Sequence, residues 1–128
     1  MEIERNNYHS LAKPVGPYVH AVKYNDTLYI SGITAFGTNA QSESIENQAR
    51  EIFNQIDKIA KEESSSLKNI IKVTIFVTDL SYMNELRNTL FDIYGGNLPA
   101  SSLIKIAGLF SEDLKIEVEA IVAILKIT

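Results

Sequence analysis

Two carboxylates near the end of the sequence are the residues best suited to acid–base chemistry. Successive side chains of a strand point to opposite faces, so Glu117 and Glu119 share one face of the strand-like run 115–127. That face continues with apolar residues. A carboxylate partly buried at a junction between subunits has a raised pKa and can act as a base on water. The alternative is that this half of the strand is solvated, with Lys105 pairing from the neighbouring strand.

A cation falls inside the apolar stripe of a predicted helix. On a helical wheel with Met83 as origin, Arg87 lies at about +40°. Leu90 and Tyr94 lie at about −20° and +20°, so the arginine lies within the apolar arc. Two interpretations follow. The guanidinium either points into a cleft beside the sheet, where it can bind a carboxylate, or it snorkels to water over an apolar surface.

Ser31 and Gly32 stand at the end of a predicted strand and can offer a hydroxyl and a close backbone approach to a ligand. No histidine is placed to activate Ser31, which argues against nucleophilic serine chemistry. His9 and His20 lie on opposite sides of a Pro-Gly turn without metal-ligand spacing, so both are assigned surface or packing roles. We therefore expect no metal and no cofactor.

The hydrophobic pattern predicts the elements that position these residues. Alternation predicts an early pair of strands joined by a turn at Asn25-Asp26, and apolar residues at three- and four-residue steps then predict a helix. β-Branched residues alternate next, which places Ile71 and Val73 on one face of a strand. The predicted elements are strands at 18–23 and 27–31, a helix at 44–62, a strand at 70–78, a helix from 79–81 to Gly95-Gly96, and strands at 101–107 and 115–127.

The order β-β-α-β-α-β-β predicts an α+β fold, in which one sheet carries both helices on one face. The helix stripes cover that face only, whereas the strands are apolar on both sides. An uncovered apolar sheet face usually contacts another subunit, so we expect a homo-oligomer.

Length and composition limit the classes of protein that the chain can represent. The 128 residues, 14.3 kDa, predict a single domain over 1–128. The net charge of −4 argues against a nucleic-acid partner, since such proteins concentrate positive charge. No apolar run reaches the roughly 18 residues of a membrane span. The first 13 residues lack the apolar region of a secretory signal, so we expect a cytoplasmic protein without a membrane partner.

Six short blocks form a recognisable pattern when they are taken in order. The blocks are Gly16-Pro17-Tyr18, Tyr29-Ile30-Ser31-Gly32, Gln48, the run Lys-Val-Thr-Ile-Phe-Val-Thr-Asp-Leu at 72–80, Pro99-Ala100, and Lys-Ile-Glu-Val-Glu-Ala at 115–120. Together they resemble the RidA family of reactive imine and enamine deaminases, whose members are also labelled translation inhibitors and endoribonucleases. The resemblance extends from about Pro14 to Ile127.

The resemblance implies a chorismate-mutase-like fold and a homotrimer with three ligand sites in clefts between subunits. It also implies hydrolysis of imines, formed from enamines such as 2-aminoacrylate, to a 2-keto acid and ammonia. In the family, an arginine binds the substrate carboxylate and a glutamate of the last strand positions the attacking water. Tyr18, Ser31, Gly32 and Glu117 stand at the positions of family site residues.

The departures from the family pattern concern the carboxylate. Ser101 stands where the family has its arginine, and Leu103 stands where a cysteine is common. Arg87 replaces a common asparagine in the second helix, and one extra residue precedes Glu117. Because serine cannot form a bidentate charged contact, we expect weak or absent deamination of 2-aminoacrylate. Arg87 is either a relocated carboxylate clamp or a coincidence.

Two interpretations of function remain open. In the first, the chain is a trimeric hydrolase for a small carboxylate metabolite, an imine or a 2-keto acid. Its catalytic residue is Glu117, and its ligand-binding residues are Tyr18, Ser31, Gly32, Arg87 and Ser101. In the second, it is a non-catalytic trimer that binds a metabolite or a protein and has a regulatory role. A ribonuclease rests only on inherited labels, and the acidic balance argues against it.

Overall fold

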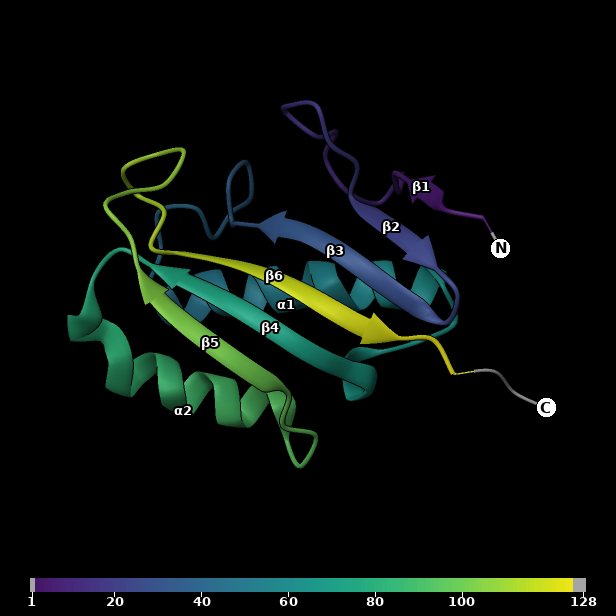
Figure 1. Ribbon diagram of the computed structural model, residues 1–128. Coiled ribbons are helices and arrows are strands. Elements are labelled where there is room, and N and C mark those ends of the chain that lie inside the picture. Colours follow the sequence, from purple (N-terminus) through teal and green to yellow (C-terminus); the bar gives the residue numbers. More distant parts are fainter. Residues whose placement is uncertain (1, 126–128) are drawn as a thin grey trace.

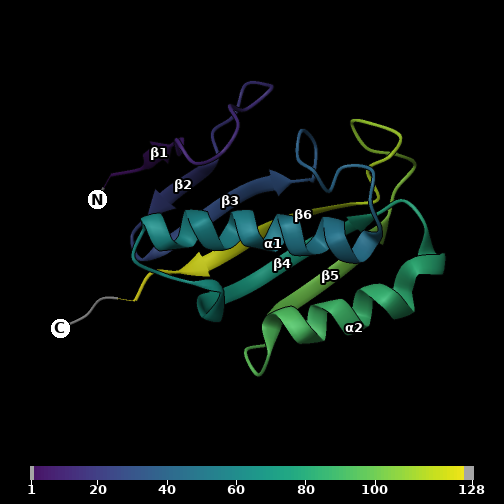
Figure 2. The same ribbon diagram turned by 180° about the vertical axis from the view of Figure 1, so that it is seen from behind.

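The computed structural model describes residues 2–125 as a six-stranded sheet with two α-helices on one face (Figures 1 and 2). This confirms the predicted α+β class and the predicted order of elements, with one strand added at the start. The elements are β1 (Glu4–Asn6), β2 (Ala21–Tyr24), β3 (Thr27–Ile33), α1 (Ile45–Glu62), β4 (Ile70–Val77), α2 (Met83–Tyr94), β5 (Ala100–Lys105) and β6 (Ile116–Ala123), with short 3-10 turns at Leu67–Asn69 and Leu80–Tyr82.

The ends of the chain differ from the prediction in two respects. β1 is a short strand of polar residues, Glu-Arg-Asn, whose pattern carries no apolar alternation, and the sequence analysis missed it. The predicted last strand ran to 127, whereas β6 ends at Ala123 and residues 126–128 lie outside the described part of the chain. The predicted turn at Asn25-Asp26 is present between β2 and β3, and Asn25 has a left-handed φ of 55°.

The sheet has the order β1-β2-β3-β6-β4-β5. Neighbouring strands are antiparallel except β4 and β5, which run parallel and are joined by α2 as a crossover. β6, the last strand of the chain, therefore lies in the middle of the sheet, paired with β3 on one side and β4 on the other. This arrangement brings Glu117 to the interior strands rather than to an edge.

The core lies between the sheet and α1. The predicted apolar stripe of α1 is buried along its whole length, and alternate residues of β4 and β6 face it. Each fully buried side chain of this kind stabilises the fold by roughly 1.5–3 kcal/mol. The main buried residues of the three elements are Ile45, Ala49, Ile52, Phe53, Ile56, Ile59, Val73, Ile75, Val77, Ile116, Val118, Ala120 and Val122.

One face assignment in β4 is wrong. The sequence placed Ile71 on the same face as Val73, but Ile71 is 47% exposed and Ile70 is buried instead. The pairing of β4 with β6 shifts register between Ile70 and Lys72, so a bulge interrupts the alternation at this point. Strict alternation cannot anticipate such a bulge.

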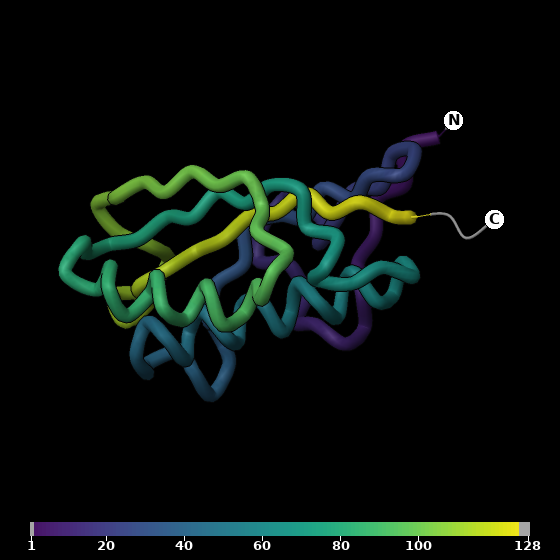
Figure 3. The backbone as a smooth tube through the Cα atoms, turned by 90° about the horizontal axis from the view of Figure 1, so that it is seen from below, coloured from purple at the N-terminus to yellow at the C-terminus, as the bar shows by residue number. Residues whose placement is uncertain are grey.

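The face of the sheet opposite the helices, called the open face below, carries no helix (Figure 3). Glu117, Glu119 and Ile121 of β6 lie on it, because their neighbours in the strand are buried beneath the helices. Tyr29 and Ile104 are each 46% exposed. Large apolar side chains are therefore exposed on a face that the chain itself does not cover. No helix within residues 2–125 has the length and apolar character needed to cross a membrane.

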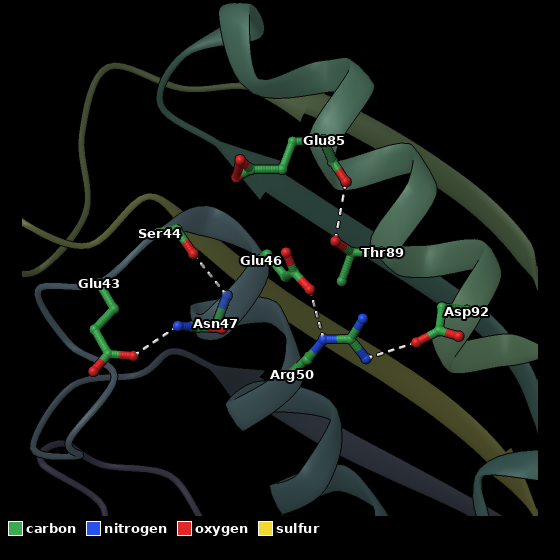
Figure 4. Close-up of polar contacts among 8 residues, drawn as sticks. All are labelled: Glu43, Ser44, Glu46, Asn47, Arg50, Glu85, Thr89 and Asp92. Atoms are coloured by element: carbon green, nitrogen blue, oxygen red, sulfur yellow. Dashed lines mark hydrogen bonds and ion pairs between the residues drawn. The ribbon is translucent and has the colours of Figure 1, made fainter.

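Polar contacts join the two helices on their outer side (Figure 4). Arg50 of α1 lies between Glu46 of its own helix, at 3.1 Å, and Asp92 of α2, at 2.9 Å. Because these groups are largely exposed, the pairs add little to stability. The Arg50–Asp92 pair joins α2 to α1, while apolar burial supplies most of the stability.

A buried amide holds two loops at the end of the sheet where β3 ends and β6 begins. Gln48 of α1 is fully buried, and its Nε2 donates to the backbone oxygens of Gln41, Glu43 and Asp113 at 2.9–3.1 Å. Its Oε1 accepts the backbone N–H of Lys115 at 2.8 Å. The loop at 34–44 and the loop at 106–115 are thus fastened to the same side chain.

We expect Gln48→Ala to lower the free energy of unfolding by roughly 2–4 kcal/mol, because it leaves buried carbonyl and N–H groups without partners. Denaturant unfolding followed by circular dichroism measures the change. Asn54→Ala, an exposed change on the same helix, serves as the control. Equal losses in the two variants would contradict the assigned role of Gln48.

Candidate functional site

A bulge in β3 places Ser31 and Gly32 beside the middle of β6. Ile30 pairs with Ala120 and Ile33 pairs with Val118, so the two residues between them face a single residue of β6, Glu119. Bulges are common next to active sites because they redirect side chains and backbone groups. The Ser31 hydroxyl donates to the Val19 carbonyl at 2.6 Å, and the Ser31 N–H donates to the His20 carbonyl at 3.0 Å. These bonds fix the bulge to the segment before β2.

The carboxylate of Glu117 packs directly against Gly32. A Cβ atom built on Gly32 would lie 2.8 Å from Oε2 of Glu117 and 2.9 Å from its Cδ, closer than real Cβ contacts allow. Gly32 does not have a positive φ, so the glycine is required by this close approach and not by backbone conformation. The absence of a side chain at 32 sets the position of the Glu117 carboxylate.

A cavity of about 400 Å³ opens beside this contact. Four of the predicted site residues line it: Tyr18, Ser31, Gly32 and Glu117. Gln55 of α1 adds an amide, and most of the remaining wall is apolar. The apolar lining residues are Leu11, Val15, Ile33, Phe36, Ile59 and Phe110.

His20 fixes the segment that carries Tyr18. Its Nδ1 accepts the backbone N–H of Tyr8 at 2.9 Å, so Nε2 carries the ring hydrogen and donates to the Ala12 carbonyl at 2.7 Å. Tyr8 stacks on the imidazole and donates its hydroxyl to Glu63 at 2.8 Å. Both ring nitrogens are therefore used structurally, in agreement with the packing role expected for His20. Among residues 2–125 no group of three histidine, cysteine or acidic side chains is arranged to hold a metal ion.

The electrostatics of the cavity favour a proton on Glu117. Burial raises the pKa of its carboxyl group above the ordinary 4.5, and the negative charge of Glu119 raises it further. Lys13 is the only lysine or arginine among the described residues that line the cavity. A carboxyl group with a raised pKa beside a hollow has the properties expected of a general base or acid.

Arg87 does not line the cavity. It is exposed on α2, and its Nη1 donates to Oδ1 of Asn84 at 3.4 Å. The buried side of α2 is centred on Leu86 and Thr89, so Arg87 lies about 130° from it on a helical wheel. The expectation of an inward-facing Arg87 is therefore wrong for the single chain. The wheel was misplaced because Thr89 is polar yet buried; its hydroxyl donates to the Glu85 carbonyl at 3.0 Å (Figure 4).

Ser101 also lies away from the cavity. Ser101 is in β5, where it pairs with Val73 of β4. It shares a face of the strand with Leu103, which packs towards the helices. The six predicted residues thus form two groups. The Glu117 group, with Tyr18, Ser31 and Gly32, lines the cavity, and the edge group, Arg87 and Ser101, lies at the border formed by β5 and α2.

The sequence analysis missed two phenylalanines of the cavity wall. The rings of Phe36 and Phe110 meet edge to face, with centroids 4.7 Å apart and planes at 81°. They come from the two loops that Gln48 fastens, and neither belongs to an alternating or helical pattern. The only available signal was the presence of a phenylalanine in each of two loops.

Fold and site together define a single-sheet α+β protein with a cavity where its central strands meet their loops. Residues 9–124 match the family model described as endoribonuclease L-PSP, and the chain belongs to this family. The resemblance to RidA proteins is thereby confirmed.

Individual relatives agree with this family assignment. A RutC family protein of Buchnera aphidicola subsp. Baizongia pistaciae is 30% identical, over 93% of this chain and 95% of that protein. The 2-iminobutanoate/2-iminopropanoate deaminase of Dermatophagoides farinae is 25% identical, over 88% of this chain and 89% of that protein. The crystal structure of RidA from the Antarctic bacterium Psychrobacter sp. PAMC 21119 matches with a TM-score of 0.79 and 29% identity, over 87% of this chain and 91% of that one.

Gly32→Ala tests the contact between the glycine and Glu117. The added methyl group must displace the carboxylate, so we expect ligand binding and any hydrolysis to fall at least about tenfold while the free energy of unfolding changes by less than about 2 kcal/mol. Binding is measured by calorimetry and stability by denaturant unfolding. Gly96→Ala is the matched control, since a Cβ at Gly96 meets no atom within 4 Å. Unchanged binding in Gly32→Ala would show that the position of the carboxylate is unimportant.

Proposed function

We propose that the chain forms a cytoplasmic homotrimer that binds a small carboxylate metabolite in clefts between subunits and hydrolyses imines to a 2-oxo acid and ammonia. The observation that carries this proposal is the Glu117 carboxyl group, with its raised pKa, packed on Gly32 at the wall of a cavity. The Dermatophagoides farinae relative is named as an imine deaminase, which supports the same reaction class.

The assembly is argued from surfaces that the single chain leaves incomplete. The open face exposes large apolar side chains, including Tyr29 and Ile104, and burial of that face by a second copy removes them from water. The Glu117 group and the edge group lie apart within one chain. A neighbouring subunit that supplies its edge group to the cavity would bring Arg87 and Ser101 to face Glu117.

The chemistry follows from the position of Glu117. As a water oxygen bonds to the imine carbon, the carboxylate takes the proton that water loses, and the C=N pair moves to nitrogen. Glu117 delivers that proton to nitrogen, which gives a carbinolamine. Transfer of the hydroxyl proton to nitrogen then breaks the C–N bond, forms C=O and releases ammonia. Tyr18 and the Ser31-Gly32 bulge hold the reacting group against the carboxylate.

The substrate carboxylate requires a cation, and Ser101 does not supply one. In the proposed trimer, Arg87 of the neighbouring subunit fills this role, since its single bond to Asn84, at 3.4 Å, leaves the guanidinium fork available. Deamination of 2-aminoacrylate, with the family arginine replaced by Ser101, is expected to be weak or absent.

A second candidate is a non-catalytic trimer that binds a metabolite or a protein partner. The serine at position 101 favours it, because loss of a charged clamp weakens catalysis more than it weakens occupancy of an apolar cavity. Binding of 2-oxo acids without any acceleration of imine hydrolysis would select this alternative.

A shared site can be tested by mixing two inactive variants. Co-expressed Glu117→Gln and Arg87→Leu subunits should regain about one quarter of wild-type hydrolysis, because about one cleft in four then combines an intact glutamate with an intact arginine. The assay follows ammonia released from imines that an amino-acid oxidase supplies. Sedimentation should give three times the 14.3 kDa chain mass.

The control mixes Glu117→Gln with Gly32→Ala, whose altered residues belong to the same group of one chain. No recovery is expected in this mixture. Recovery in neither mixture, or a monomer in sedimentation, would rule out the shared cleft.

The pH dependence of hydrolysis tests Glu117 as the base. The ionised form is active, so the rate should rise with pH through a pKa above 4.5. Glu119→Gln removes the neighbouring negative charge, lowers the pKa of Glu117 and should move this limb to lower pH. Glu112→Gln, in an exposed loop, should leave it in place.

The raised pKa of Glu117 should also make the free energy of unfolding depend on pH. Because the folded-state pKa of Glu117 lies above its unfolded value, folding favours the protonated form, and the free energy of unfolding falls as pH rises through that window. Glu117→Gln should flatten this part of the curve. An acid limb unmoved by Glu119→Gln would show that another group controls the reaction.

A further inference from the structure

The apolar end of the cavity is built from exposed aromatic side chains. Phe110 is 70% exposed and Phe36 is 41% exposed, although the two rings contact each other. A ligand that covers exposed aromatic groups at the rim of a cavity removes a large apolar area from water, which favours binding. With Val15 and Ile33 beside them, they form what we call the aromatic wall.

The two loops that carry this wall are held rigidly. Asp113 accepts the hydroxyl of Ser111 at 2.6 Å and that of Ser42 at 2.7 Å, and these bonds lower its pKa to about 2. Gln41 adds a weaker contact at 3.3 Å, and Gln48 joins both loops from below. The phenylalanines are therefore positioned by neighbouring hydrogen bonds before any ligand arrives, which lowers the entropy cost of binding.

The size of the cavity exceeds that of the smallest imino acids. The six non-hydrogen atoms of 2-iminopropanoate are bonded to one another, so they occupy less than the roughly 180 Å³ of six liquid water molecules. The cavity measures about 400 Å³. An imino acid with a phenyl group has twelve non-hydrogen atoms, which occupy less than the roughly 360 Å³ of twelve water molecules, so the cavity has room for it as well.

We propose that the cavity is specific for 2-imino acids, and their 2-oxo acid products, that carry a bulky apolar side chain, aromatic or branched, which packs on Phe36 and Phe110. The inference rests on the proposed function, because it assumes that the reacting end lies at Glu117. Glu117 and the aromatic wall line the same cavity, so a single ligand can contact both. Specificity then comes from the side-chain end, at residues that take no part in the chemistry.

Binding of stable 2-oxo acids tests the proposal directly. Pyruvate, 4-methyl-2-oxopentanoate and phenylpyruvate are titrated calorimetrically into the wild-type protein, and Kd should fall at least about tenfold from the first to the last. Phe110→Ala should weaken phenylpyruvate binding about tenfold and leave pyruvate binding within about twofold. Because Phe110 is largely exposed, this change removes no core packing.

Tyr24→Ala is the matched control. Tyr24 is an aromatic residue, 41% exposed, at the hairpin between β2 and β3, which lies at the other end of β3 from the bulge. It should bind all three acids as the wild type does. Equal affinities for the three acids, or an equal loss for pyruvate and phenylpyruvate in Phe110→Ala, would overturn the proposal. A change of sedimentation in Phe110→Ala with no effect on binding would also overturn it, since a neighbouring subunit would then cover the aromatic wall.

Hydrolysis rates separate this inference from the proposed function. Imines made from alanine, leucine and phenylalanine are supplied by an amino-acid oxidase, and the phenylalanine product should react fastest. Faster hydrolysis of the alanine product would reject the bulky-ligand specificity and leave imine hydrolysis standing. Phe110-dependent binding of phenylpyruvate without hydrolysis of any imine would support the specificity and reject the catalytic function.

Discussion

The candidate site of this molecule depends on one close contact, that of the Glu117 carboxylate with the backbone of Gly32. The contact requires three conditions together. β6 must pair next to β3, the β3 bulge must place Gly32 against the Glu117 side chain, and position 32 must lack a side chain. A register slip of one residue would turn Glu117 into the core. Ile116 or Val118, which are buried in the observed register, would then take its place on the open face. Sheet register and site geometry are thus the same constraint.

The surroundings of Glu117 lower the stability of its ionised form. Its carboxyl group is half-buried, a second carboxylate lies two residues away, and no cation of the described chain forms an ion pair with it. Each of these features disfavours the ionised form. The large apolar core between α1 and the sheet offsets this loss of stability. A cationic group brought near Glu117 by a neighbouring subunit would favour its ionised form.

Much of the fold follows from periodic patterns, and the exceptions have physical reasons. The stripe of α1 and the alternation of β6 predict both elements because each buries one face only. β1 escapes prediction because it is short and polar, and Ile71 because a bulge breaks the alternation.

The candidate site could be predicted only where local sequence encodes it. Ser31-Gly32 and Glu117 stand in family-like blocks, and the structure brings both to one cavity. The pairing of Phe36 with Phe110 depends on two loops far apart in the chain, which no local pattern reports. Arg87 was misplaced on the wheel because burial of Thr89 depends on an intrahelical hydrogen bond that residue type does not reveal.

The central place of β6 has a consequence for how the chain acquires its structure. β3 and β4 are synthesised well before the strand that fills the space between them, so each leaves the ribosome with an unpaired edge. Such edges can pair with other chains, and contacts between distant parts of a sequence form slowly. The gap closes only when β6 inserts, and the same event brings Glu117 to Gly32. The contact between Glu117 and Gly32 therefore forms together with the pairing that covers the aggregation-prone edges.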